Sequence, residues 1–504
     1  MPRLGRRPAE RNGGGAVKPR LVACIGLLAA CQAEESPAPA TALTHEQMLD
    51  PLTCAVCHQK HYDEWASSMH AYAADDPIFL AMNRRGQREA GIGDFCVQCH
   101  APMALRTGAT QDGLNLDSVP QSLKGVTCYF CHSVDAVEGT HNNPLRLASD
   151  DVLRGPLSDP LPSSAHRSEY SRLHDRDQLD SASLCGSCHD IQNGHGTHIE
   201  RTFAEWQESV FAEPMIGTTC GQCHMDQSVD LEPVASVPGA APRRLHSHRF
   251  PAVDLPIDRE PDEVTRQAVQ SFLDTSLQSA LCVRGLSAQD AQIQLVLDNV
   301  AAGHRWPSGS AQDRRAWVEL AAYAQGAAFY QSGVVPAGSS VTGLEDPDLW
   351  LIRDCMFDAA GNETHGFWAA TDYESNLLPG QLTFDSSDPR YYQSHVLQRY
   401  PRDLGPLALY PERVTAQVWL QPIGLDVFDE LVNSGDLVDT ERYTVAELRQ
   451  RLQPLSVGAP IEWTSATANE RFVEAGLPVA CISATNLSAA ADKVPAVNHI
   501  RCRP

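Results

Sequence analysis

One short pattern recurs along the first half of the chain and limits what this half can form. The pattern is Cys-x-x-Cys-His, two cysteines three positions apart with a histidine directly after the second. Its five copies begin at Cys54, Cys96, Cys128, Cys185 and Cys220. The chain has 16 cysteines and 19 histidines among 504 residues, too few for five such matches to arise by chance. The five copies therefore indicate one chemistry that is repeated five times.

Three kinds of site use paired cysteines, and only one of them needs the histidine. Zinc ribbons bind each metal with two pairs, and five pairs cannot be divided evenly. A thioredoxin-type dithiol uses a single pair at the start of a helix. Covalent attachment of haem uses all three residues, because two thiols bond the porphyrin and the adjacent imidazole binds its iron. The pattern therefore predicts five covalently attached haem c groups.

Each copy supplies the same set of haem contacts. The predicted thioether bonds are at Cys54, Cys57, Cys96, Cys99, Cys128, Cys131, Cys185, Cys188, Cys220 and Cys223. The predicted proximal iron ligands are His58, His100, His132, His189 and His224. The chain between motifs is too short to build a hydrophobic core around each one, so we expect the apolar porphyrins to form the interior of this part.

The second axial ligand of each iron decides what the iron can do. An iron with two protein ligands transfers electrons, whereas an iron with an open face can bind and transform a small molecule. The remaining histidines are numerous enough for every iron to have two. The candidate distal ligands are His70, His166, His248 and His304. We place His70 first, because it follows the first motif on a predicted helix and can turn toward a neighbouring haem.

The N-terminal sequence predicts export and lipidation. Basic residues precede the apolar run Leu21–Ala30, which suits a signal peptide and is too short to span a bilayer. The run ends at Cys31 in a pattern like a bacterial lipobox, which predicts a lipid on that thiol. The alternative is a plain secretory signal that contains a cysteine. We expect a lipoprotein signal peptide at 1–31 and a tether at 32–48.

The residue after Cys31 and the net charge predict where the mature chain is located and which partners it can bind. Gln32, rather than aspartate, follows the lipidated cysteine; by resemblance to lipoprotein sorting, this favours the outer membrane of the cell envelope, facing the periplasm or the cell surface. The formal net charge of −24 repels nucleic acid, so we expect no nucleic-acid partner. We expect redox proteins as partners and membrane contact through the lipid alone.

The residue pattern changes along the chain and predicts a mixed fold, with a helical and irregular part followed by a β-rich part. A mainly helical and irregular pentahaem cytochrome c domain is expected at 49–250, and a linking helix at 251–284, where Pro261–Leu281 is amphipathic. A β-rich, sandwich-like domain is expected at 285–504. Its predicted strands cover 291–300, 316–324, 348–357 and 413–422, with short helices at 427–432 and 445–452.

Four cysteines remain outside the motifs and the signal peptide: Cys282, Cys355, Cys481 and Cys502. An even number in an oxidising compartment predicts two disulfides, with three connectivities open. We expect Cys481 to pair with Cys502, because that bond would fasten the C-terminal tail. The alternative is that these cysteines are free buried thiols.

Several segments carry a resemblance to a known family. They read CAVCHQKHYDEWASSMH, GVTCYFCH, AHRSEYSRLHDRDQLDSASLCGSCHD and NVAAGHRWPSG, between about Leu52 and Gly309. They resemble the multihaem c-type cytochromes typified by the tetrahaem electron carrier of ammonia oxidisers, distant relatives of hydroxylamine oxidoreductase. The resemblance implies stacked haem pairs, mostly bis-histidine, with His70 and His304 as distal ligands. The chain departs from that carrier in its five motifs and long C-terminal part.

Two functions from different classes follow. The first is a pentahaem, lipid-anchored electron carrier of the bacterial cell envelope, working in an outer-membrane or extracellular electron-transfer complex. The second is a multihaem oxidoreductase in which one open haem acts on a small nitrogen or sulfur compound. A third reading gives the main role to the β-rich part, which would dock onto a surface partner or stack copies into a filament. The surplus of histidines favours the carrier over a catalyst.

Overall fold

The computed structural model describes residues 42–484 and 493–500, which all belong to one compact unit that begins at Pro37. The predicted signal peptide, Cys31, most of the tether and Cys502 lie outside the described residues. No helix in the described ranges combines the length and the apolar character needed to cross a bilayer.

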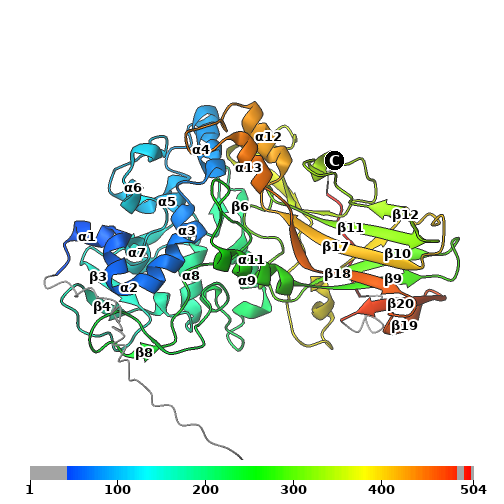
Figure 1. Ribbon diagram of the computed structural model, residues 1–504, viewed down its shortest axis with the longest axis horizontal. Coiled ribbons are helices and arrows are strands. Elements are labelled where there is room, and N and C mark those ends of the chain that lie inside the picture. Colours follow the sequence, from blue (N-terminus) through cyan, green and yellow to red (C-terminus); the bar gives the residue numbers. More distant parts are fainter. Residues whose placement is uncertain (1–41, 485–492, 501–504) are drawn as a thin grey trace, which may run out of the picture. The chain divides into compact units, whose positions relative to one another are not determined.

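The motif-bearing part consists of short helices and two-stranded sheets separated by irregular chain (Figure 1). Its α-helices are α1 His45–Leu49, α2 Pro51–Ala66, α3 Met69–Tyr72, α4 Pro77–Ala90, α5 Val97–His100, α6 Pro102–Arg106, α7 Cys128–His132, α8 Ala182–Gly186, α9 Thr202–Glu208 and α10 Cys220–His224. Its strand pairs are β1 Val134–Val137 with β2 Leu145–Leu147, β3 Val152–Gly155 with β4 Arg167–Tyr170, β5 Ile191–Gln192 with β6 His198–Glu200, and β7 Glu232–Pro233 with β8 Pro242–Arg243.

Local sequence explains where the motif helices begin. Thr127 and Thr219 cap α7 and α10, each accepting a hydrogen bond from a backbone N–H in the first turn. Asp50 caps α2 in the same way, and Pro51 occupies its first position. Three of the five motifs therefore lie on helices that start at a capped residue.

The C-terminal part is a sandwich of two sheets that share one hydrophobic core (Figure 1). The first sheet has the order β16 His395–Tyr400, β10 Gln292–Asn299, β9 Leu277–Arg284, β20 Leu477–Ser483 and β19 Glu470–Glu474. The second has the order β12 Ala327–Ser332, β11 Arg315–Ala324, β17 Arg413–Gln421 and β18 Leu455–Thr464, with β13 Leu351–Ile352 beside β11. Burial alternates along β17, which is typical of a strand with one face on a core. The β-rich C-terminal part agrees with the prediction.

The predicted linking helix over 251–284 is wrong in its extent. The helix is α11, Glu263–Ser276, and Asp262 caps it. Residues 277–284 instead form β9, which pairs with β10 on one side and β20 on the other. The pairing partners are distant in sequence and outweigh the helical pattern that continues past Ser276. The β-rich part therefore begins near Leu277, and the single strand predicted at 348–357 is divided into β13 and β14, Asp354–Phe357.

The expected disulfide between Cys481 and Cys502 is also wrong. Cys481 bonds Cys282, because the register of β20 on β9 places these two residues directly opposite each other. The bond joins positions 199 residues apart, a separation that sequence spacing gives no means to foresee. Cys355 is disulfide-bonded as well, so it is not a free thiol.

Helix α4 joins the motif-bearing part to the C-terminal part. One side of it, with Ile78 and Met82, packs against α12 Leu425–Asn433 and α13 Val445–Arg451. Phe79 and Leu80 pack instead against residues of the second motif and the helix after it. The two parts predicted as separate domains therefore share apolar contacts through this helix.

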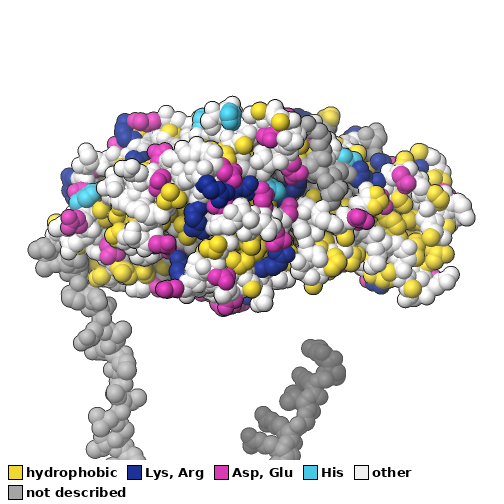
Figure 2. All heavy atoms as spheres, turned by 90° about the horizontal axis from the view of Figure 1, so that it is seen from above, with side chains coloured by type: hydrophobic (Ala, Val, Ile, Leu, Met, Phe, Trp, Pro, Cys, Tyr) yellow, Lys and Arg dark blue, Asp and Glu magenta, His cyan; other side chains and the backbone are white. Residues whose placement is uncertain are grey.

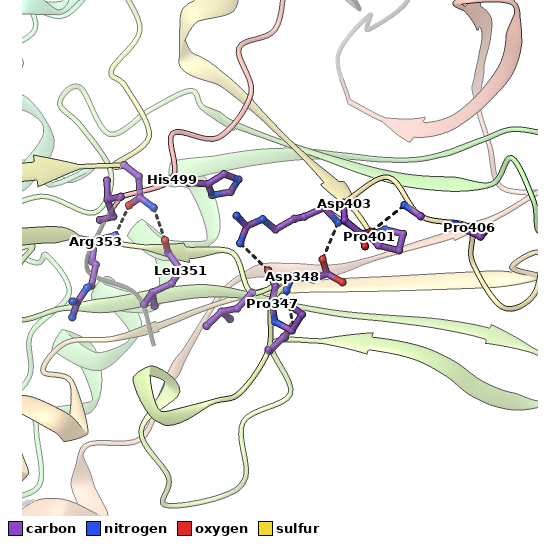
Figure 3. A pocket seen from close by; sticks show the side chains of 14 residues that line it. Pro347, Asp348, Leu351, Arg353, Pro401, Asp403, Pro406 and His499 are labelled. Atoms are coloured by element: carbon purple, nitrogen blue, oxygen red, sulfur yellow. Dashed lines mark hydrogen bonds between the residues drawn. The ribbon is translucent and has the colours of Figure 1, made fainter.

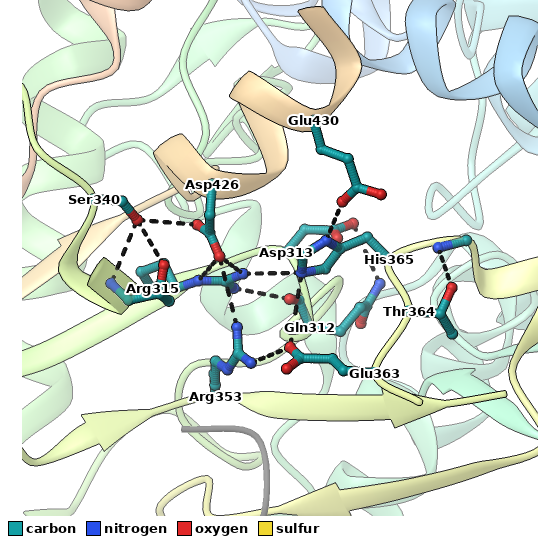
Figure 4. Close-up of polar contacts among 12 residues, drawn as sticks. Gln312, Asp313, Arg315, Ser340, Arg353, Glu363, Thr364, His365, Asp426 and Glu430 are labelled. Atoms are coloured by element: carbon teal, nitrogen blue, oxygen red, sulfur yellow. Dashed lines mark hydrogen bonds and ion pairs between the residues drawn. The ribbon is translucent and has the colours of Figure 1, made fainter. Parts of the chain in front are cut away.

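A buried polar network continues this connection (Figure 4). Arg315, whose side chain is fully buried on β11, pairs with Asp426 at 2.6 Å and donates to His365 Nε2 at 3.2 Å. His365 Nδ1 donates to Glu430 at 2.5 Å, and the other oxygen of Glu430 pairs with Arg85 of α4 at 2.7 Å. Hydrogen bonds from His365 and Arg85 lower the pKa of Glu430 from 4.5 to about 2.

The lowered pKa predicts how stability depends on pH. The ionised Glu430 stabilises the fold fully above its unfolded pKa, and this contribution is lost as pH falls from about 4.5 toward 2. Glu430→Gln should therefore be less stable than the wild type at pH 7, by no more than about 1 kcal/mol because the carboxylate is partly exposed. The difference should shrink as pH falls through this window.

Denaturant unfolding at a series of pH values measures the difference. Glu441→Gln, at an exposed position before α13, is the matched control. A difference between the Glu430 variant and wild type that stays constant from pH 7 to pH 2 would contradict the role given to this contact.

Candidate haem-binding site

The five motifs present their thiols in a form suited to porphyrin attachment. Residues three positions apart lie on one side of a helix, so the cysteine pairs within α2, α7 and α10 face the same way. None of the ten motif cysteines forms a disulfide, which leaves all ten available for thioether bonds. The first motif lies inside α2, where the helix is kinked at His58.

Contacts between thiols of different motifs show which motifs are neighbours. The thiol of Cys54 hydrogen-bonds that of Cys128, which joins the first motif to the third. Cys188 contacts Cys99 of the second motif, and Cys185 contacts Cys220 of the fifth.

The third motif also lies near the fourth. Burial, followed by the nearby thiols of Cys188 and Cys185, raises the pKa of Cys131 to about 12. The fourth motif therefore contacts the second and the fifth and lies near the third.

Every motif histidine is oriented by a hydrogen bond at Nδ1. In four of them a backbone carbonyl accepts this bond: Val234 from His58 at 2.8 Å, Ala73 from His100 at 3.1 Å, Arg154 from His132 at 2.5 Å and Pro251 from His224 at 2.7 Å. Carbonyl oxygens only accept, so the proton is on Nδ1 and the lone pair is on Nε2. This is the tautomer that an iron ligand requires, and the second hydrogen bond fixes its orientation.

The fourth motif histidine differs in its partner. His189 Nδ1 donates to the carboxylate of Glu200 at 3.2 Å. Surrounding protein atoms disfavour charge on His189, although half of its side chain is exposed, but the hydrogen bond and negative charge of Glu200 outweigh this effect and raise the pKa of this imidazole to about 9.

Three motif histidines each have a second histidine at the ring separation that one shared iron would require. The ring centroids are 6.3 Å apart for His58 and His166, and 6.2 Å apart for His189 and His70. They are 6.5 Å apart for His132 and His248. Two imidazoles that bind one metal from opposite sides, each with a bond of about 2.0 Å, have centroids roughly 6 Å apart. The geometry of these three pairs therefore fits bis-histidine ligation.

The fourth candidate, His304, lies in the segment between β10 and β11. It is partly buried, and its Nδ1 donates to the carbonyl of Arg305 at 2.7 Å, which leaves Nε2 for another bond. Burial and then the proximity of other groups, His224 foremost among them, lower its pKa to about 4. His304 is therefore a neutral imidazole beside the fifth motif and is contributed by the C-terminal part.

The surroundings of His70 and His248 also favour neutral imidazole. Burial, and then the neighbouring His189, lowers the pKa of His70 to about 3. Burial likewise holds the pKa of His248 well below its usual value. His166 is only partly buried and has the weakest orientation, with its Nδ1 3.3 Å from the Arg167 carbonyl.

The second motif has a different neighbour. Among the described residues, the ring that packs against His100 is Phe79 of α4, with centroids 4.1 Å apart and the planes within 4° of parallel. No described histidine stands opposite His100 at the separation found in the three pairs.

Sequence reasoning missed three residues near these sites. His61, three positions after His58, contacts the ring of His248 at 4.8 Å, and its spacing from the motif was an available signal. His174 lies 5.7 Å from His132, but its Nε2 donates to the Cys131 carbonyl at 2.7 Å, which leaves only its buried Nδ1 without a partner. Glu200 had no signal in the sequence.

A cavity of about 880 Å³ in the C-terminal part lies apart from the motifs (Figure 3). Asp348, Arg402, Asp403 and His499 are among the residues that line it, and no motif residue does. Charged groups of both signs surround it, and we assign it no part in haem binding.

Comparison with known proteins agrees with the donor set. Residues 53–133, which contain the first three motifs, match the family described as cytochrome c554 and c-prime. No curated protein matches the chain. Among solved structures, a penta-haem cytochrome c552 from Thermochromatium tepidum has a similar fold, with a TM-score of 0.55 and 18% identity over 83% of this chain and 99% of that one. These findings, with the free thiols and oriented imidazoles, support a multihaem c-type cytochrome that binds haem c.

Proposed function

We propose that the chain is a pentahaem electron carrier of the bacterial cell envelope, held at the outer membrane by a lipid on Cys31. One observation carries the proposal: three motif histidines each have a further histidine nearby, with ring centroids 6.2 to 6.5 Å apart. Iron held by two imidazoles changes oxidation state with little rearrangement, as electron transfer requires.

The neighbouring motifs support a route for electrons. Thiol contacts join the first motif to the third and the fourth motif to the second and fifth, and the third motif lies near the fourth. When bound, haem supplies one-electron chemistry, and the chain's own residues fix the position and the axial ligands of each iron.

The charge of the chain bears on which redox partner it would bind. The net charge of −24 favours a cationic redox protein at the docking stage. Acidic side chains are spread over the face drawn in Figure 2, with basic groups among them. Partner choice would then depend on local pairs of charges more than on the overall field.

Replacing one predicted distal ligand tests the ligand set. In His248→Gly, we expect one iron in five to change from low spin to high spin, because the iron facing His132 loses its second imidazole. In His174→Gly, we expect the low-spin signals to be unchanged, since the Nε2 of His174 is occupied by the Cys131 carbonyl. Electron paramagnetic resonance of the purified, haem-loaded proteins measures both.

Two outcomes would contradict this proposal. A high-spin signal in His174→Gly alone would assign that ligand position to His174. High-spin signals from most irons of the wild type would remove the support for a carrier.

Lipid anchoring has a separate test. We expect Cys31→Ser, expressed in a bacterium that processes lipoproteins, to move from the membrane fraction to the soluble envelope fraction. Cys24→Ser, within the same apolar run, should remain with the membrane. Equal fractionation of Cys31→Ser and wild type would show that the lipid does not hold the protein.

A second candidate function is a multihaem oxidoreductase with one open iron. The observation that favours it is that, among the described residues, no histidine lies near His100 at the separation found in the three pairs. We then expect carbon monoxide to shift the Soret band of the reduced protein with about one-fifth of the full amplitude.

A variant locates any such site. The double variant Cys96→Ala/Cys99→Ala, which cannot attach the second haem, should lose the carbon monoxide response, whereas Cys54→Ala/Cys57→Ala should keep it. If carbon monoxide does not alter the wild-type spectrum, this second function is excluded.

A further inference from the structure

The hydrogen bonds behind the motif histidines are of two kinds. Four motif histidines donate Nδ1–H to neutral backbone carbonyls, and His189 alone donates to a carboxylate, that of Glu200. The difference therefore falls on the fourth motif, which contacts the second and fifth motifs and lies near the third.

Glu200 is held in place by its strand. It ends β6, where it pairs with Ile191 of β5, two residues after His189. Its side chain is only 13% exposed. Gly309 lies directly beside it, since a Cβ on that glycine would stand 3.9 Å from the carboxylate. The strand pairing holds the backbone of Glu200, and the hydrogen bond to His189 Nδ1 places the carboxylate behind the imidazole.

The nearest cations do not neutralise Glu200 by direct pairing. Arg201, the next residue, pairs with Asp354. Arg314 holds Asp254 through two hydrogen bonds of 2.8 Å each. Among the described residues, the ion pair formed by Glu200 is with His189.

We propose that Glu200 is a positioning residue that lowers the reduction potential of the haem attached at Cys185 and Cys188. This inference rests on the proposed haem-binding function. A carboxylate that accepts the Nδ1 proton makes the imidazole a stronger donor to iron, and its charge favours the ferric over the ferrous state. Low exposure strengthens both effects.

The negative charge of Glu200 also affects histidines other than His189. It acts on the imidazoles of His100 and His304 as well as on His189. The haem attached at the fourth motif would therefore be harder to reduce than it would be with a carbonyl partner behind His189.

A redox titration of the haem-loaded protein tests the inference. In Glu200→Gln, which keeps an oxygen acceptor and removes the charge, we expect one of the five one-electron waves to move most to a more positive potential, with smaller shifts in the same direction for neighbouring haems and the low-spin signals preserved. Glu208→Gln, an exposed change of the same charge on α9, should leave every wave in place. The measurement is spectroelectrochemical, with electron paramagnetic resonance on the same samples.

The outcomes separate this inference from the function on which it rests. Five waves that are the same in Glu200→Gln and wild type would overturn the role of Glu200 alone. An equal shift in Glu208→Gln would assign the effect to overall charge and would also overturn it. A chain without five haems, or with mostly high-spin iron in wild type, would remove the proposed function first.

Discussion

The orientation of the motif imidazoles is the constraint on which the motif-bearing part depends. Each imidazole must keep its Nε2 lone pair for iron, so Nδ1 needs an acceptor at a fixed place. The acceptors come from Val234, Ala73, Arg154 and Pro251, all outside the motifs they serve. Carbonyls that are not used within helices are free for this purpose, which explains why so much of this part is irregular chain.

The parts that were predictable from sequence are those determined by neighbouring residues. The motif spacing predicts the thioether cysteines and proximal histidines because attachment chemistry is local. The alternation along 413–422 predicts β17 for the same reason. His70, His166, His248 and His304 could be named as candidates, but the motif each one faces depends on folding at long range. The family match extends over 53–133 only, so the link to the tetrahaem carrier remains a resemblance.

The parts that were not predictable are set by contacts between distant segments. Residues 277–284 continue a helical pattern, yet β10 and β20 offer them partners on both sides. The same pairing sets Cys282 opposite Cys481. The number and spacing of the cysteines in the sequence do not reveal this strand register. Glu200 illustrates the limit most clearly, because a single acidic residue after a short strand has no pattern of its own.

Helix α4 has a mechanical consequence. Ile78 and Met82 bind it to the C-terminal helices, while Phe79 lies flat against His100. Apolar packing of this density resists gradual deformation and transmits displacement. A displacement of α12 or α13, such as one caused by a docking protein, would therefore shift α4 and with it the ring that packs against the imidazole of the second motif.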